Sequence, residues 1–386
     1  MTTTLSPIPL TGTPFPKTEY ERRQKKVVET MERTGLDALV VTDHAHLQYL
    51  SGYNGRGGYF APFLLIFVPG KQPTYVVREY EVASVRAESC IEEIIPYTQQ
   101  NEFPKVSADV LRKYGVHCKR VGFELCCWHV APADVGAIQA QLPDLKVIDA
   151  TRLVASVAAV KSDLELALVR KLMVMTDAAV RTFQTSLRAG ATETEVAAAI
   201  GDEIEKGGGA LARGLTLVFG ERTRLPHGSP ADFPIRDGEP AMFEGGAMKD
   251  GYAIGVVRSA VLGRHPETEA LHDVSVEALE AAIAAIKPGI TAHEVDAATR
   301  KVIEKSGRQH IFRHRTGYQT GINWSERGSL SLEPDAKDVL QAGMTLHMPI
   351  ILFSENGYLI GASEHVLVTD SGAEILSQTP HTLHYA

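Results

Sequence analysis

The chain has 386 residues, of which 44% are apolar and 22% charged, and its formal net charge is −8. This length allows a sizeable buried core and predicts two or three domains. The acidic balance excludes the basic field that would attract nucleic acid or an anionic membrane. No apolar run reaches the roughly 18–20 residues that a membrane-spanning helix needs.

The start of the chain and the cysteines both favour a cytoplasmic location. The opening MTTTLSPIPLTGTPF has neither the cationic nor the apolar region of a secretory signal. Adjacent Cys126 and Cys127 lack both zinc-ligand and redox spacing. They lie in an apolar stretch and are expected to be buried free thiols, and the four cysteines, with Cys90 and Cys118, fit a reducing compartment.

The first half of the chain alternates between apolar runs and helix-prone segments. The run LDALVVTD is typical of a buried strand, and Asp43 is expected to begin a turn after it. Strands are predicted at residues 36–43, 60–70, 73–78, 119–125 and 146–150, and helices at 17–34, 107–115 and 133–142. This alternation predicts a small α/β domain over residues 1–155.

The second half, residues 156–386, begins with a long helix and contains an internal repeat. The helix spans residues 160–190 and starts with a Ser162-x-x-Glu165 capping box. Residues 189–200 resemble residues 288–299, and each copy has a Thr N-cap with a Glu three positions later. The repeat predicts an α+β domain with pseudo-two-fold symmetry and a site between its halves. Capped helices are common, so coincidence is the alternative.

Four polar clusters in this half lie in apolar or Gly-rich surroundings. They contain His227; then Glu244 and Arg258; then His314, Tyr318, Trp324 and Arg327; and finally His347 and Glu364. Glu244 follows the apolar Ala-Met-Phe, and a carboxylate in such a run must be paired, hydrogen-bonded or shifted in pKa. The alternatives are a solvated edge-strand carboxylate for Glu244 or Glu364, a structural ion pair for Arg258, and core histidines for His314 and His347.

The order of these clusters resembles the creatinase/aminopeptidase P/prolidase (M24) superfamily, whose catalytic domain has the pita-bread fold. In its peptidases, two Asp, one His and two Glu hold two metal ions. AMFEGGAMKDGY and GVVRS resemble the motifs of the two Asp, which places Glu244 and Gly255 at these positions. HRTGYQTG places Tyr318 at the metal His, and GMTLHMPI places Pro349 at the first Glu. EHVLVT resembles the motif of the second Glu and keeps Glu364.

Three of these five positions therefore carry no suitable metal ligand. Glycine and proline offer no side-chain donor, and tyrosine is a poor ligand for hard divalent ions at neutral pH. The resemblance thus implies a domain that has lost its dinuclear site, with no resident metal and no other cofactor. The motifs most resemble those of the metal-independent creatinase and ectoine hydrolase.

The function predicted from this resemblance is metal-independent hydrolysis of a C–N bond in a small zwitterionic amidine, guanidino or amide compound. The catalytic residues are predicted to be His227 as a proton shuttle, Glu244 as base or nucleophile, and Glu364 as an orienting carboxylate. Substrate-binding residues are predicted to be Arg258, His314, Tyr318, Trp324, Arg327 and His347, with Tyr53, Arg56, Tyr59 and Phe60 from the first domain.

The Gly-rich loop at residues 51–60 carries exposed aromatic residues in this prediction. The resemblance implies a homodimer in which the loop reaches the pocket of the neighbouring subunit. The alternative is a surface loop with one packed aromatic residue. Three other functions stay open: an Xaa-Pro peptidase, a lyase acting on a sulfonium or betaine acid, and a non-catalytic binding protein.

Overall fold

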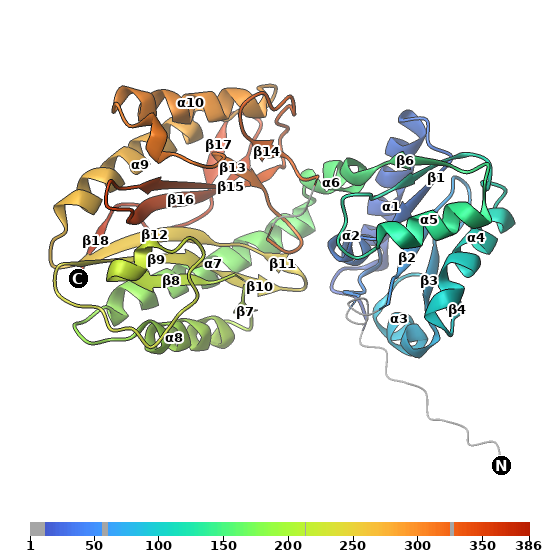
Figure 1. Cartoon of the computed structure of the whole chain (residues 1–386), viewed down its shortest axis with the longest axis horizontal. Coiled ribbons are helices and arrows are strands. Elements are labelled where there is room, and N and C mark those ends of the chain that lie inside the picture. Colours follow the sequence, from blue (N-terminus) through green and yellow to red (C-terminus); the bar gives the residue numbers. More distant parts are fainter. Residues whose placement is uncertain (1–11, 56–60, 213, 325–327) are drawn as a thin grey trace, which may run out of the picture. The chain divides into compact units, whose positions relative to one another are not determined.

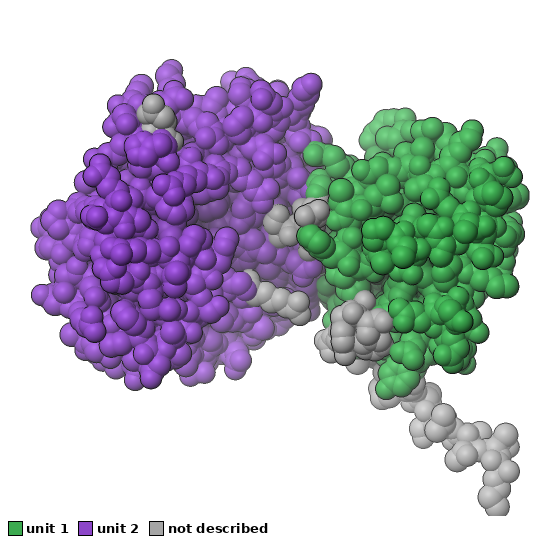
Figure 2. Space-filling view, in the orientation of Figure 1, with its two compact units in different colours: residues 1–158, 326–328 green, residues 159–325, 329–386 purple. Residues whose placement is uncertain are grey.

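The chain forms two compact units. The computed structural model describes residues 12–55, 61–212, 214–324 and 328–386. One unit comprises Met1–Ala158 with Glu326–Gly328, and the other comprises Ala159–Ser325 with Ser329–Ala386 (Figure 2). They are called unit 1 and unit 2 below.

Unit 1 is built on a six-stranded mixed sheet in the order β4-β3-β2-β1-β5-β6 (Figure 1). Its strands are β1 (Ala38–Val41), β2 (Leu64–Phe67), β3 (Thr74–Arg78), β4 (Glu93–Tyr97), β5 (Arg120–Phe123) and β6 (Lys146–Asp149). Its helices are α1 (Lys17–Arg33), α2 (His44–Ser51), α3 (Val82–Glu88), α4 (Phe103–Lys113) and α5 (Pro132–Gln141), while α6 (Thr151–Ala159) runs to the division between the units. The predicted α/β character of this half is confirmed.

One local prediction in unit 1 is wrong. Asp43 does not begin a simple turn, because it is the N-cap of α2 and its side chain accepts a hydrogen bond from the backbone N–H of Ala45. Aspartate is among the preferred residues at this position, since it satisfies an amide that has no partner within the helix.

Unit 2 consists of two helix pairs with β-sheets between them (Figure 1). The helices are α7 (Asp163–Ser186), α8 (Glu193–Lys206), α9 (Pro266–Ala285) and α10 (Ala292–Lys305). The sheets have the orders β18-β12-β9-β8, β14-β13-β15-β16-β17 and β11-β10-β7. The strands are β7 (Ala210–Leu211), β8 (Thr216–Phe219), β9 (Glu239–Gly245), β10 (Ala247–Lys249), β11 (Tyr252–Ala253), β12 (Val256–Leu262), β13 (Gly317–Gln319), β14 (Ser331–Leu332), β15 (Thr345–Phe353), β16 (Leu359–Val368), β17 (Ala373–Ile375) and β18 (His384–Tyr385).

The internal repeat is present as two matching helix starts. The α8 N-cap Thr192 and the α10 N-cap Thr291 both form capping boxes, with Glu195 and Glu294. The glycine two residues before each cap donates its backbone N–H to the carbonyl of a later segment. Gly190 donates to Ile235 and Gly289 donates to Leu340, both at 2.9 Å. The capping box at Ser162, which begins α7, is also present.

Cys126 and Cys127 are more accessible than predicted. Cys118 and Cys126 are exposed, and Cys90 and Cys127 are half-buried. The buried stretch that includes β5 ends at Glu124, and Leu125 and Cys126 already lie in an exposed connection. All four thiols are free. Among the helices of the described residues, none combines the length and apolar character that a bilayer crossing requires.

The two matched capping boxes should stabilise unit 2 to a similar degree. We expect Thr192→Ala and Thr291→Ala each to lower the free energy of unfolding by about 1 kcal/mol, because each removes an acceptor for an end amide. The control is Thr185→Ala near the end of α7, where the exposed hydroxyl only supplements a helical carbonyl. The free energy of unfolding of this control should stay within about 0.5 kcal/mol of the wild-type value. Urea denaturation followed by circular dichroism measures all three, and equal losses would contradict the capping role.

Candidate active site

Polar side chains from β9, β13, β15 and β16 gather in unit 2, where β12 of one sheet meets β16 of the other. The hydroxyl of Ser363 on β16 accepts a hydrogen bond from the backbone N–H of Val257 on β12 at 2.6 Å. Ser259 on β12 donates its hydroxyl to the carbonyl of Gly361 on β16, also at 2.6 Å. These bonds fix the two strands against each other and so set which side chains face the site.

Glu244 lies on β9 between two neighbouring strands. Its cross-strand partners are Thr216 on β8 and Val257 on β12. The carboxyl is half-buried, and burial raises its pKa above the ordinary value, while the nearby His227 acts in the opposite direction. Among the described residues, no side chain or backbone group donates a hydrogen bond to it. The hydroxyl oxygen of Thr216 beside it is also buried without a hydrogen-bond partner in the described part of the chain.

Tyr318 on β13 lies at one end of a chain of hydrogen bonds. Its hydroxyl accepts from the indole N–H of Trp324 at 2.6 Å and lies 3.1 Å from Nδ1 of His347. Nε2 of His347 lies 2.8 Å from the hydroxyl of Ser363. Because Ser363 already accepts from Val257, its own hydrogen is best directed at His347 Nε2.

That assignment fixes the tautomer of His347. The ring is fully buried, and burial lowers its pKa well below the ordinary value, so it is neutral. With Nε2 accepting from Ser363, the ring proton sits on Nδ1 and is donated to Tyr318. Tyr318 then accepts two hydrogen bonds, and its own O–H is free to point elsewhere. Burial and the charge of Glu244 raise the pKa of this phenol, so it stays protonated.

Trp324 occupies the space that a side chain at position 255 would need. A Cβ added to Gly255 would lie 2.0 Å from Cη2 of the indole and 2.6 Å from the carbonyl oxygen of Gly245. The indole also packs edge-on against His347, with ring centroids 5.3 Å apart. Gly255 and Trp324 are therefore complementary, and a carboxylate at position 255 would displace the indole.

The structure places Glu364 and Arg258 in a buried ion pair. Both side chains are 1% exposed, and Nη2 of Arg258 lies 2.7 Å from Oε1 of Glu364. The hydroxyl of Ser377 donates to the other carboxylate oxygen, Oε2, at 2.6 Å. Nδ1 of His381 lies 3.3 Å from Oε1, the oxygen that Arg258 also contacts. Burial alone would raise the pKa of Glu364, but His381, Arg258 and Ser377 together lower it. The structure thus shows the structural ion pair that the sequence left open as the alternative for Arg258, and both carboxylate oxygens of Glu364 accept hydrogen bonds from within the protein.

The residue of β16 that faces His347 is Ser363 and not Glu364. Neighbouring residues of a strand point to opposite faces, so Glu364 is directed away from the site that Ser363 enters. Ser363 is the cross-strand partner of Pro349 on β15, whose side chain offers no donor atom. His365, which shares the face of Ser363, lies 2.6 Å from the hydroxyl of Thr320. Strand alternation counted from Glu364 could have identified Ser363.

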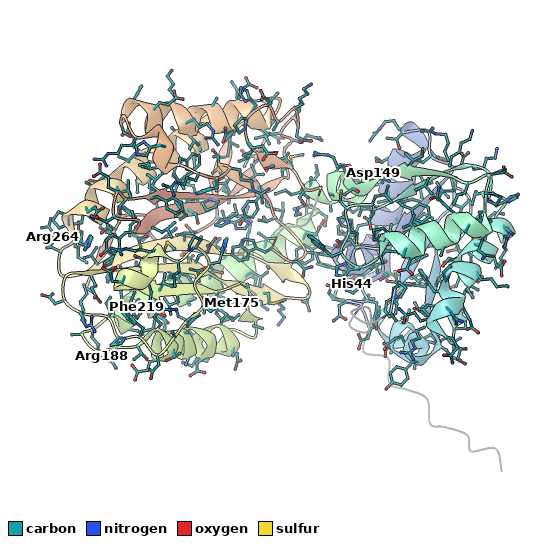
Figure 3. All side chains as sticks on the ribbon, viewed as in Figure 1. His44, Asp149, Met175, Arg188, Phe219 and Arg264 are labelled. Carbon is teal, nitrogen blue, oxygen red and sulfur yellow. The ribbon has the colours of Figure 1, made fainter. Side chains whose placement is uncertain are left out.

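His227 is exposed and lies in the segment between β8 and β9 with φ of +55°. Glu193 at the start of α8 holds that segment at both ends. Its buried carboxylate accepts from the backbone N–H groups of Phe219 (labelled in Figure 3) and Ala231, both at 2.8 Å, and pairs with Arg222. His227 is close enough to Glu244 to affect the pKa of that carboxyl, and their side chains form neither a hydrogen bond nor an ion pair.

Two other predicted substrate-binding residues, His314 and Tyr53, are hydrogen-bonded to other groups of the protein. Both ring nitrogens of His314 meet backbone carbonyls, Nδ1 that of Arg315 at 2.7 Å and Nε2 that of Ile351 at 3.0 Å. Tyr53 is 1% exposed in unit 1 and donates to Glu81 at 3.0 Å, so it is not the exposed aromatic residue that was predicted. Arg56, Tyr59, Phe60 and Arg327 lie outside the described residues.

The donor set of unit 2 does not fit a pair of metal ions. Within residues 12–55, 61–212, 214–324 and 328–386, the one group of three His, Cys, Asp or Glu side chains with metal-binding spacing is in unit 1. At the positions that the resemblance aligns with ligands, Gly255 and Pro349 have no donor atom and Glu364 is held by Arg258. Glu244 and Tyr318 alone cannot supply the oxygen and nitrogen ligands that two divalent ions require.

Comparison with known proteins identifies the family to which this architecture belongs. The profile of metallopeptidase family M24 matches residues 167–370, and that of the creatinase/prolidase N-terminal domain matches residues 23–160. A Sinorhizobium fredii protein named uncharacterized hydrolase/peptidase y4tL is 29% identical over 96% of this chain and 97% of its own length. The Xaa-Pro dipeptidase of Pyrococcus horikoshii is 25% identical over 93% of this chain and 97% of its own.

Solved structures confirm the fold. Dipeptidase PepE from Mycobacterium ulcerans superposes with a TM-score of 0.86 at 23% identity, covering 96% of this chain and 100% of that one. An Xaa-Pro dipeptidase from Bacillus anthracis gives 0.81 at 21% identity, covering 95% and 100%. The predicted combination of a creatinase-type α/β domain and a pita-bread domain is therefore correct.

The function predicted from the sequence is wrong in its main reading. Similar proteins with a named activity include dipeptidases, Xaa-Pro dipeptidases, prolidases and an X-Pro aminopeptidase. They favour a peptide bond over the non-peptide C–N bond of an amidine or guanidino compound. The prediction gave too much weight to local motifs around Tyr318 and Pro349, whereas similarity over the whole chain favours the peptidase alternative.

The Arg258–Glu364 pair should contribute much more to stability than an exposed pair does. We expect Glu364→Gln to lower the free energy of unfolding by about 3–5 kcal/mol, because it leaves the buried guanidinium without a counter-charge. The matched control is Glu374→Gln, which breaks the exposed pair with Arg170 and should cost less than about 1 kcal/mol.

The pH dependence follows from the lowered pKa of Glu364. Its ion pair is complete above the pKa of about 4.3 of glutamate in the unfolded chain, and it is lost as the pH falls through the lower folded-state value. Urea titrations at pH 7 and in steps below pH 5 should show the difference between wild type and Glu364→Gln shrinking with acid. A difference that is small at pH 7, or that grows as the pH falls, would contradict this assignment.

Proposed function

Because this chain belongs to metallopeptidase family M24, we propose that it hydrolyses the amide bond of short peptides, with Xaa-Pro dipeptides as the substrate class. The support is the similarity over nearly the whole chain to the Xaa-Pro dipeptidase of Pyrococcus horikoshii, together with the geometry around Glu244. The predicted cytoplasmic location and homodimer remain part of this proposal.

The observation that carries the proposal is the environment of Glu244. Burial raises the pKa of this carboxyl, which brings its proton exchange closer to neutral pH, where a general acid–base catalyst works best. Among the described residues it has no hydrogen-bond donor, so it is available to water or substrate. The buried hydroxyl of Thr216 beside it offers a further polar group to a bound peptide.

Hydrolysis then proceeds by proton transfers at Glu244 and a hydrogen bond from Tyr318, which keeps its proton. The Glu244 carboxylate takes a proton from water while the water oxygen bonds to the carbonyl carbon of the substrate. The O–H of Tyr318, which Trp324 and His347 hold in place, donates to the developing oxyanion. Glu244 then returns its proton to the amide nitrogen as the C–N bond breaks. The residues present do not fit the metal pair of the family, and no step requires it.

A second function is binding of short peptides without turnover. The observation in its favour is the complementary fit of Gly255 and Trp324, which fills a position where the resemblance places a metal ligand. An apolar indole beside a half-buried carboxyl can recognise a peptide whether or not the peptide is cleaved. Measuring binding and cleavage on the same peptides distinguishes the two functions.

The test is a panel of Xaa-Pro dipeptides with wild type and Glu244→Gln. Wild type should release proline, and Glu244→Gln should lower kcat by about 10²–10⁴ with a smaller change in KM, because the substitution keeps the shape and removes the acid–base group. On the acid side, wild-type kcat should rise with pH through a pKa above that of an ordinary glutamate, because the carboxylate is the active form.

The control is Glu239→Gln, the same change at the opposite end of β9. There the carboxylate accepts a hydrogen bond from the backbone N–H of Arg236. It should leave kcat within about twofold, since the group is not part of the acid–base step. Glu244→Gln with wild-type turnover refutes the role of Glu244. If wild type binds dipeptides tightly but does not cleave them, the result supports the second function, peptide binding without turnover, and contradicts hydrolysis.

A further inference from the structure

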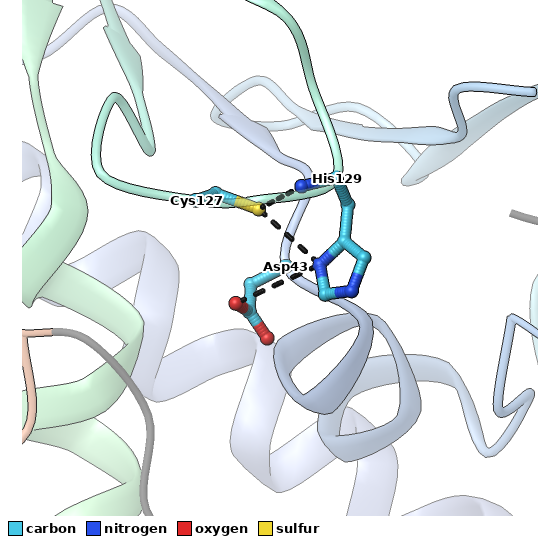
Figure 4. Close-up of side chains that lie close together, drawn as sticks. All are labelled: Asp43, Cys127 and His129. Atoms are coloured by element: carbon cyan, nitrogen blue, oxygen red, sulfur yellow. Dashed lines mark hydrogen bonds and ion pairs between the residues drawn. The ribbon is translucent and has the colours of Figure 1, made fainter. Parts of the chain in front are cut away.

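Three side chains of unit 1 converge on one point, away from the residues considered so far. Asp43, Cys127 and His129 each direct a potential metal-ligand atom toward the other two, and these atoms all lie within 4.8 Å of one another (Figure 4). Cys127 Sγ is 3.4 Å from His129 Nδ1, and Asp43 Oδ2 is 3.9 Å from the same nitrogen.

The position of Asp43 leaves one oxygen available. Its Oδ1 accepts the backbone N–H of Ala45 at 2.8 Å and caps α2, while Oδ2 faces His129. The backbone N–H groups of Thr42 and Asp43 both donate to Oε2 of buried Glu124, at 2.7 and 2.8 Å. Glu124 therefore fixes the turn that presents Asp43, from the same segment that continues to Cys127.

His129 is held by a second histidine. The ring of His44 stacks on it with centroids 3.6 Å apart and planes 10° from parallel. The stack fixes the plane of the His129 imidazole, as expected for a preorganised ligand. The backbone N–H of His129 also donates to Cys127 Sγ at 3.2 Å.

The geometry excludes a nucleophilic Cys-His-Asp triad. In such a triad the cysteine and the aspartate contact opposite ring nitrogens, whereas here both contact Nδ1. Three potential ligand atoms, one each from Asp43, Cys127 and His129, lie together as in a chelate.

We propose that Asp43, Cys127 and His129 bind one divalent transition-metal ion of the zinc type, with the fourth position open to water or a ligand. Tetrahedral zinc at its usual bond lengths separates neighbouring N, O and S ligands by roughly 3.3–3.6 Å. The Cys–His separation of 3.4 Å already fits, and metal binding would draw Asp43 Oδ2 in from its 3.9 Å separation from His129 Nδ1. A thiolate with an imidazole selects zinc or cobalt over magnesium or calcium. The His129 side chain is 29% exposed, which gives the ion a path in.

The test uses the full-length chain, stripped of metal with a chelator and titrated with Co²⁺ as a spectroscopic probe. Wild type should bind one Co²⁺ with a thiolate-to-cobalt charge-transfer band and tetrahedral d–d bands, and Zn²⁺ should displace it. Cys127→Ser should abolish the charge-transfer band. His129→Gln and Asp43→Asn should weaken Co²⁺ binding by at least about 100-fold, since loss of a second-shell partner alone costs about 10–100-fold.

Two controls keep the result specific. Cys126→Ser changes the adjacent exposed thiol, which lies outside the group, and should retain the full spectrum. Asp43→Asn preserves an N-cap side chain for α2, so its loss of affinity reports the metal and not the helix. Without any substitution, Zn²⁺ should protect Cys127 of wild type from alkylation and leave Cys126 reactive, as peptide mapping by mass spectrometry measures.

Three results overturn the site: a wild-type protein without the charge-transfer band, a band that survives Cys127→Ser, or equal alkylation of Cys127 with and without Zn²⁺. Because the site lies in unit 1 and its readouts are spectroscopic and chemical, none of these results depends on whether unit 2 cleaves peptides.

Discussion

The buried ion pair between Arg258 and Glu364 is the constraint on which the rest of unit 2 depends. Two charges removed from water are tolerated only if they neutralise each other and are hydrogen-bonded. Arg258 neutralises Glu364 and donates from its two Nη atoms also to the carbonyls of Ser363 and Thr379, while its buried Nε has no hydrogen-bond partner in the described part of the chain. The pair therefore joins β12 to β16 and holds the segment after β17 in place.

This ion pair determines which side chains of β16 face the candidate active site. With Glu364 committed to Arg258, strand alternation directs Ser363 to the opposite face, where it meets His347 and the backbone of Val257. His347 in turn orients Tyr318. The site thus obtains its geometry from a charge pair that does not enter it, and its half-buried carboxylate is Glu244.

Sequence reasoning succeeded where local patterns carry the information. Capping boxes at Ser162, Thr192 and Thr291 are short-range features, and all three are present. The order of the motifs was enough to identify the fold, since each motif belongs to a different strand or loop of one domain.

Features that depend on tertiary contacts were beyond the same reasoning. The face taken by Glu364 depends on its pairing with Arg258, and the burial of Tyr53 depends on Glu81, which is distant in the chain. No spacing rule links Asp43 to Cys127 and His129, because the fold of unit 1 brings α2 and the segment after β5 together. The complementarity of Gly255 and Trp324 likewise needs coordinates.

The central claim is that an indole and a hydrogen-bonded histidine–tyrosine network replace a metal-ligand set around Glu244. Crystals grown with Mn²⁺ and measured at the manganese absorption edge test it most directly. The account predicts indole density against Gly255 and no anomalous peak within coordination distance of Glu244. Two strong peaks beside Glu244, with Trp324 displaced, would contradict it.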